Sequence, residues 1–176
     1  MSDLPLYAVP EPRWASRGTR DVERVRRALG ALVRTVHHVG GTSVPDLPAL
    51  PVLDLLAEVE SLERLVQARL RLLAHGFEPA GPHPEDCRLY VVDDLLTGER
   101  RVELRCYPAG HPEAERIPAL FALLRARPDL ARAYHEAKLA AWDAYAADPA
   151  AYHACKRAWL ERVVDEALTL WGVARG

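Results

Sequence analysis

Apolar residues recur at spacings of three and four along much of the chain, which is the pattern of amphipathic helices. The first helix is expected to begin near Thr19, where a capping hydroxyl precedes the acidic residue Asp21. A second helix is expected over Ser61–His75, with Ser61 as its cap and Gly76 closing it in a left-handed turn.

The chain after Pro112 is helical in pattern almost to its end. Pro118 is expected in the first turn of a helix, where its missing N–H costs least, and Pro128 is expected to stop that helix. The sequence therefore predicts three C-terminal helices, over Glu113–Arg127, Asp129–Ala147 and Pro149–Val173.

Four segments favour strands. Thr35–Val39 is rich in β-branched residues and is followed by two glycines. Val52–Glu60 is predicted as a second strand, and a turn at Thr97-Gly98 joins two more into a hairpin over Arg88–Asp94 and Arg101–Tyr107. The resulting order predicts an α+β fold with a small mixed or antiparallel sheet and a helical C-terminal region. We expect one domain over residues 1–176, with the sheet part in about 19–110 and the helical part in about 111–173.

Composition narrows the class of protein. The 176 residues carry 23 Lys and Arg against 25 Asp and Glu, a formal charge of −2, so there is no strong nucleic-acid signal. Three cysteines without a C-x-x-C pair argue against a disulfide framework and a zinc ribbon. No apolar run reaches the roughly 18 residues of a membrane span, and the N-terminal sequence lacks a signal-peptide pattern. A cytoplasmic location away from membranes is the expectation.

The segment after the first predicted strand has the residues of an anion-binding loop. Gly40 and Gly41 let the backbone approach a ligand, and their N–H groups can line an anion. Thr42 and Ser43 add hydroxyl donors. A tight turn without a ligand is the alternative interpretation of the two glycines.

Asp54 stands inside an otherwise apolar predicted strand. Strand alternation places it on one face with Val52, Leu56 and Glu58. A carboxylate there is costly unless it has a partner, so we expect a metal, a cation or a hydrogen-bond donor on that face.

The stretch HVGGTSVPDLPALPVLDL, which begins at residue 38, resembles the GrpB-family signature HIGSTSVPGLxAKPIIDI, within the nucleotidyltransferase-fold superfamily. The resemblance continues through residues 107–138, the late Tyr152-x-x-x-Lys156 and the early Trp14. It implies a nucleotidyltransferase-like fold and a nucleotide or another small phosphorylated ligand. In that picture Gly40, Gly41, Thr42 and Ser43 hold phosphates, Asp54 binds Mg²⁺, and positive charge comes from Arg105, Lys138 and Lys156.

This chain departs from the family pattern at positions that matter for chemistry. Active members of the superfamily carry a second carboxylate two residues after the first, and Leu56 stands there. Leu50 replaces a lysine, and a His-Leu-His segment becomes Glu103-Leu-Arg105. Glu103 can supply a second metal ligand and catalytic carboxylate if its strand lies beside that of Asp54. A direct Asp54–Arg105 salt bridge is the alternative, and it would favour a catalytically inactive module that binds a small anion or a protein partner.

Other candidates carry weaker signals. His83-x-x-Asp86-Cys87 has metal-binding residue types but no second cluster. His37 and His38 point in opposite directions on a strand, and core packing is the favoured role for His38.

Overall fold

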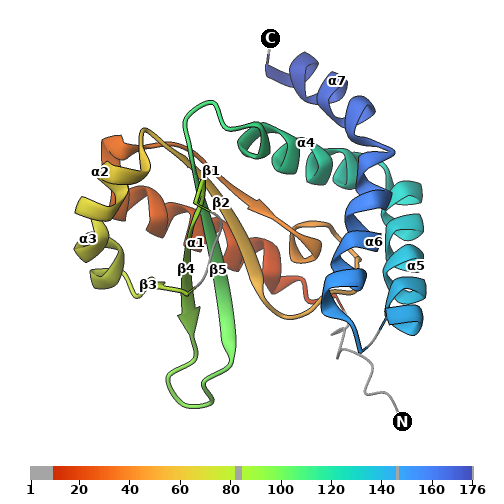
Figure 1. Cartoon of the computed structure of the whole chain (residues 1–176), viewed down its shortest axis with the longest axis horizontal. Helices are drawn as coiled ribbons and strands as arrows, with labels where there is room; N and C mark the ends of the chain where they lie inside the picture. The colour runs from red at the N-terminus through yellow and green to blue at the C-terminus, as the bar shows by residue number, and fades with distance from the viewer. Residues whose placement is uncertain (1–9, 82–84, 146, 176) are drawn as a thin grey trace.

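The computed structural model describes residues 10–81, 85–145 and 147–175, and this part of the chain forms one mixed sheet flanked by helices (Figure 1). Its five strands lie in the order β1-β2-β5-β4-β3. Their bounds are β1 Val33–Val39, β2 Leu53–Val59, β3 Glu78–Pro79, β4 Arg88–Asp93 and β5 Arg100–Pro108. The α+β class expected from the sequence is confirmed.

The central pair of strands is parallel, and the other pairs are antiparallel. β2 pairs in parallel with β5, β1 runs antiparallel to β2, and β4 and β5 form the predicted hairpin. Two pairs of register partners position the candidate site: Asp54 lies opposite Glu103, and Leu56 lies opposite Arg105. Adjacent partners in a sheet point to the same face, so all these side chains share one side of it.

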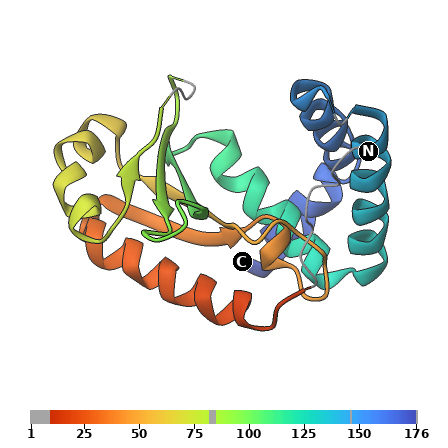
Figure 2. The same cartoon turned by 90° about the horizontal axis from the view of Figure 1, so that it is seen from below.

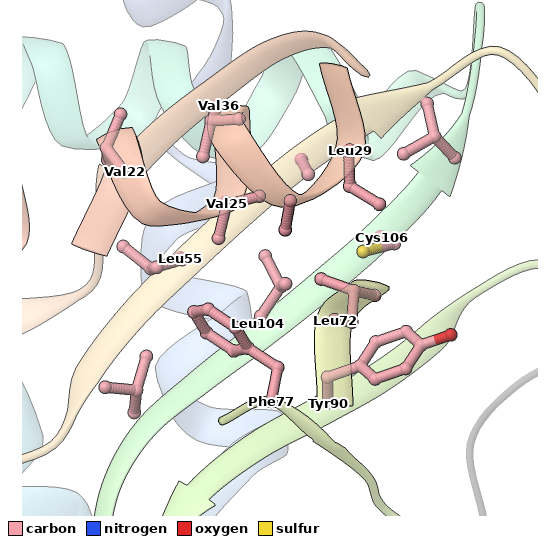
Figure 3. Close-up of a cluster of buried hydrophobic side chains, with 14 of the residues drawn as sticks. Val22, Val25, Leu29, Val36, Leu55, Leu72, Phe77, Tyr90, Leu104 and Cys106 are labelled. Atoms are coloured by element: carbon pink, nitrogen blue, oxygen red, sulfur yellow. The ribbon is translucent and has the colours of Figure 1, made fainter. Parts of the chain in front are cut away.

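The first face of the sheet is covered by the N-terminal helix α1 and two short helices. The fully buried Leu55 and Leu104 of the sheet pack there with Val25 and Leu29 of α1 and with Phe77 (Figure 3). The helices on this face are α1 Arg13–Leu29, α2 Leu62–Gln67 and α3 Arg69–Ala74. This main core fixes the faces of β2 and β5 and leaves Asp54 on the opposite one.

The second face is covered by the C-terminal helices. Leu56 and Val39 of the sheet pack against Phe121 and Leu124 of α4, on the side away from α1 (Figure 2). α4 packs on α7, and α5 packs on α6. These helices are α4 Pro112–Ala126, α5 Pro128–Tyr145, α6 Pro149–Glu161 and α7 Val164–Arg175.

Several predicted bounds are wrong at the N-terminal end. α1 starts at Arg13 rather than near Thr19, and the Thr19 hydroxyl donates back to Ala15 O inside the helix. Gly18 interrupts the helical pattern in the sequence, but it lies where a Cβ would come within 2.2 Å of the His38 ring. The glycine therefore serves helix-to-strand packing and does not end the helix.

The helix predicted over residues 61–75 is divided at Ala68. Ser61 accepts from Arg64 N and Gly76 has φ +76°, so the predicted cap and stop are confirmed. The turn at Ala68 rotates the second half, so Leu72 is buried while Leu70 stays exposed. The prediction of one continuous apolar face along this helix is therefore wrong.

The C-terminal helices also differ from expectation. Pro118 lies in the second turn of α4, six residues after Pro112, and it is buried. The single helix predicted over Pro149–Val173 is two helices, separated after Glu161. Among the residues described, no helix is long and apolar enough to cross a bilayer.

We expect Leu104→Ala to lower the free energy of unfolding by about 2–5 kcal/mol, because it opens a cavity in the main core. Leu95→Ala removes the same atoms from a side chain that is 100% exposed at the hairpin turn, so it should change stability by less than about 0.5 kcal/mol. Urea denaturation of both variants measures this. Equal losses would contradict the core assigned here.

Candidate functional site

The glycine loop follows β1 directly and lies against the start of β2. Val39, the last residue of β1, is the register partner of Asp54. Gly40 has φ +75°, and a Cβ built there would lie 2.2 Å from Asp54 Oδ2 and 2.9 Å from Asp54 Cβ. A side chain at Gly40 is therefore excluded both by the backbone conformation and by the Asp54 carboxylate.

Hydrogen bonds within the loop hold its shape. Gly41–Ser43 form one turn of 3-10 helix, and the Ser43 hydroxyl donates to Gly40 O at 2.7 Å. The Thr42 hydroxyl donates to Val52 O at 3.3 Å and lies 3.0 Å from His38 Nε2. Both hydroxyl protons are used inside the loop. In this conformation, anion binding would depend on backbone N–H groups and on neighbouring cations.

Asp54, Glu103 and Arg105 form one bridged cluster on the second face of the sheet. Arg105 Nη1 donates to Asp54 Oδ1 at 3.2 Å, and Nη2 donates to Glu103 Oε2 at 2.9 Å. Arg100 Nη1 donates to the other oxygen, Glu103 Oε1, at 3.2 Å. The sequence analysis expected these residues to meet only if their two strands lie side by side, and the structure brings them together. The ion pair considered as an alternative partner for Asp54 is present.

The cluster is reachable from solvent but closely surrounded by protein. The side chains of Arg105, Asp54 and Glu103 keep 39%, 28% and 26% of their surfaces exposed. Burial raises the pKa of Asp54, while the positive charges of Arg105 and Lys156 lower it less strongly. Asp54 is therefore held beside its ion-pair partner at a cost in desolvation.

The two candidate lysines project from the helical layer to different parts of the site. Lys138 of α5 is only 4% exposed, and its Nζ donates to Pro48 O at 3.0 Å. A Cβ built on Gly41 would lie 3.8 Å from that Nζ, so Lys138 lies beside the glycine loop. Burial and the charge of Lys156 lower the pKa of Lys138 to about 8.

Lys156 of α6 lies close enough to Asp54 for their charges to interact. Burial lowers its pKa, and the nearby Asp54 opposes that shift. Each lysine ammonium lies over the ring of the tyrosine one turn earlier, at 5.3 Å from Tyr134 for Lys138 and 5.0 Å from Tyr152 for Lys156. The spacing of four residues, about one helical turn, accounts for both contacts.

The sequence prediction omitted two residues that the structure brings to the site. His153 lies one helical turn before Lys156, and its pKa is lowered by burial and by the charges of Lys156 and Arg105. Arg125 of α4 donates Nη1 to Ser43 Oγ at 3.2 Å. The helical spacing of 153 from 156 was a usable signal, whereas nothing local indicated that α4 reaches the loop.

A cavity of about 460 Å³ adjoins the loop on the side of α4 and α5. Val44, Leu47 and Leu124 supply the apolar part of its lining. Arg125 also lines the cavity, and it donates a hydrogen bond to Ser43 of the loop. Its volume lies in the range of small-molecule sites, roughly 300–1,000 Å³.

The weaker candidates occupy other places. His38 packs against Gly18 of α1, while His37 lies 5.5 Å from the Trp171 ring, so the two point to opposite faces as expected. Asp86 pairs with His111 at 3.0 Å and Cys87 is buried, while His83 lies outside the described residues. In the part of the chain that the structure describes, no cluster of three or more His, Cys, Asp or Glu side chains is arranged to hold a metal ion.

The arrangement around Asp54 does not fit Mg²⁺ as it stands. A magnesium ion needs near-octahedral oxygen ligands at about 2.0–2.1 Å. Here the Arg105 guanidinium contacts both Asp54 and Glu103. The next residue on the same face of β2 is Leu56, which has no oxygen in its side chain to offer a metal. The donor set implied by the family resemblance is therefore already engaged by a cation of the chain.

We expect Gly40→Ala to destabilise the fold by about 1–3 kcal/mol more than Gly76→Ala. The two glycines have φ +75° and +76°, so both variants carry the same backbone penalty, but a Cβ on Gly76 meets nothing within 4 Å. Thermal or urea unfolding measures the difference. Equal destabilisation would contradict the close approach of Gly40 to Asp54.

We expect a pH-dependent difference in stability between the wild type and Asp54→Asn. Because the folded pKa of Asp54 is raised above its ordinary 3.8, the stability it contributes is fully present below 3.8 and is lost as pH rises through the folded pKa. The unfolding free energy of the wild type should therefore fall relative to that of Asp54→Asn as pH rises above about 4. Urea denaturation at several pH values measures it, and movement toward the wild type would show that Arg105 dominates over burial.

Known proteins resemble the chain in sequence and in fold. UPF0157 protein YqkA of Bacillus subtilis (strain 168) is 29% identical over 123 residues, which cover 69% of this chain. The match covers 35% of YqkA, so the chain spans about a third of the length of that curated relative. Conserved protein GrpB from Enterococcus faecalis has a crystal structure that matches with a TM-score of 0.77 and 24% identity, over 93% of this chain and 98% of that one.

The fold extends to more distant structures. The Cid1 poly(U) polymerase with bound MgGTP matches with a TM-score of 0.53 and 13% identity, over 76% of this chain and 43% of that one. This likeness shows a nucleotidyltransferase-like fold and nothing about activity. A family model described as GrpB protein matches residues 8–166, which is most of the chain. The chain therefore belongs to the GrpB family.

Proposed function

We propose that this protein binds a nucleotide or another small phosphorylated ligand beside the glycine loop and the Asp54–Arg105–Glu103 cluster. The observation that carries the proposal is the convergence of cationic side chains on that place. Arg105 comes from the sheet, and Lys138 and Lys156 come from two helices of the C-terminal layer. Cations that converge from separate elements are the arrangement that recognises phosphate groups.

The energetic cost of these groups supports a ligand. Burial lowers the pKa of both lysines, and the charge of Lys156 lowers the pKa of Lys138 further. A phosphate group bound near them would favour their ammonium forms and offset that cost.

Nucleotides are the first ligand class to test because of the fold. The matched Cid1 structures hold MgGTP, MgATP and a UTP analogue. Those proteins are only 11–13% identical to this chain, so their ligands guide the choice of probes and no more. Nucleotidyl transfer itself would need carboxylates available to a metal, and the engagement of Asp54 and Glu103 by Arg105 favours a binding role over that reaction.

We expect at least one of ATP, UTP, coenzyme A and inorganic pyrophosphate to raise the melting temperature. A ligand at about 100 times its dissociation constant adds about 2.7 kcal/mol of apparent stability, a shift of several degrees. Lys156→Gln should weaken the binding of that ligand, because the substitution removes a cation beside Asp54. Thermal shift and calorimetric titration measure both effects.

Arg157→Gln is the matched control. It removes one positive charge from the same helix, but Arg157 is exposed and is not among the charges that act on Asp54. Equal weakening by the two variants would mean that only overall charge matters. A lack of response to all four probes would contradict the proposed function.

A further inference from the structure

Every oxygen of the two candidate metal-binding carboxylates has a neighbour within this chain. Asp54 Oδ1 and Glu103 Oε2 accept from the two arms of Arg105, and Glu103 Oε1 accepts from Arg100. Asp54 Oδ2 is turned against Gly40, where a Cβ would lie only 2.2 Å away. Three of the four oxygens of the pair therefore already accept a hydrogen bond from an arginine of this chain.

The strand geometry explains why one guanidinium can reach both acids. Asp54 and Glu103 are direct partners on parallel strands, and Arg105 lies two residues further along β5 on the same face. Adjacent strands are about 4.8 Å apart, and two residues of strand span about 6.6 Å. The planar fork of arginine suits two carboxylates at such distances, whereas the point charge of lysine does not.

A metal ion and this guanidinium exclude each other. A metal ion shared by the two acids would need the oxygens that Arg105 already uses, Asp54 Oδ1 and Glu103 Oε2. Two cations a few ångströms apart in a partly buried site also repel each other strongly. Both members of the Glu103–Arg105 pair also stand where the family signature has histidine, so the acid and the guanidinium depart from the signature together.

We propose that Arg105 is a fixed cation that takes the position of a divalent metal, so that this chain binds its anionic ligand without one. An arginine has five N–H donors, and two of those on Arg105 are used on Asp54 and Glu103. The side chain is 39% exposed, so a ligand can reach it from solvent. The inference rests in part on the proposed function, because the ligand is taken to be a phosphorylated small molecule.

The first test needs no ligand. Mn²⁺ binding is followed by electron paramagnetic resonance of free Mn²⁺ in titrations of the wild type, Arg105→Ala and Asp54→Asn. The wild type should bind no more Mn²⁺ than Asp54→Asn does. Arg105→Ala leaves two carboxylates without their shared counter-charge and should bind Mn²⁺ at least about tenfold more tightly than the wild type.

A second variant keeps the test decisive if Arg105→Ala does not fold. The double variant Glu103→His, Arg105→His restores the family signature and should also gain Mn²⁺ binding, with circular dichroism confirming its fold. Stoichiometric Mn²⁺ binding by the wild type that Asp54→Asn abolishes would overturn the inference. Folded variants that both fail to gain Mn²⁺ would overturn it too, because Arg105 would not be what excludes the metal.

A ligand titration separates this inference from the proposed function. Calorimetry with ATP and with pyrophosphate is carried out in EDTA and again in Mg²⁺. Binding of equal strength in the two buffers supports Arg105 as the cation, and binding that requires Mg²⁺ overturns it. No binding in either buffer contradicts the proposed function, and the Mn²⁺ titration then decides the inference alone.

Discussion

The parallel pairing of β2 with β5 is the constraint on which the site depends. It places Asp54 beside Glu103 and sets Arg105 two residues further on, within reach of both. A parallel pair in the middle of a sheet is normally covered on both faces, and here the two layers of helices do that. The first layer, with α1, completes a dry core. The second layer covers the polar face and brings lysines to it.

The two faces of the sheet therefore differ in chemical character: one is apolar throughout, and the other carries charged groups. On one side apolar burial is uninterrupted, and Leu55 and Leu104 lose all contact with water. On the other side the apolar cluster around Leu56 ends at a group of buried and half-buried charges. Such groups contribute little net stability, since desolvation offsets much of their attraction. Their retention at one place is a sign that the place serves recognition.

Alternation along single strands was sufficient to predict much of the site. The period of two placed Asp54 on one face of its strand and Glu103 with Arg105 on one face of another, and the structure has both arrangements. The parallel pairing of those strands was beyond sequence reasoning, because it joins segments separated by α2, α3, β3 and β4. The positions of Arg125 and His153 depend on the same long-range packing.

The errors in the helices have local physical reasons. At Ala68 the helix is interrupted for one residue, and Leu72 rather than Leu70 enters the core. Gly18 and Pro118 are residues that usually end or disturb helices, yet tertiary packing keeps both inside one. Propensity is a weak prior where a neighbouring side chain, such as His38 beside Gly18, fills the space.

The hydrogen bond from Lys138 to Pro48 joins residues 90 positions apart in the chain. Contacts of such long sequence separation form late in folding, since the intervening chain must first be ordered. The loop after β1 thus gains its contact with Lys138 only once α5 has docked. A nascent or truncated chain that lacks this helix can complete the first core and still leave the loop without that hydrogen bond, so the candidate site is complete only after α5 has been synthesised.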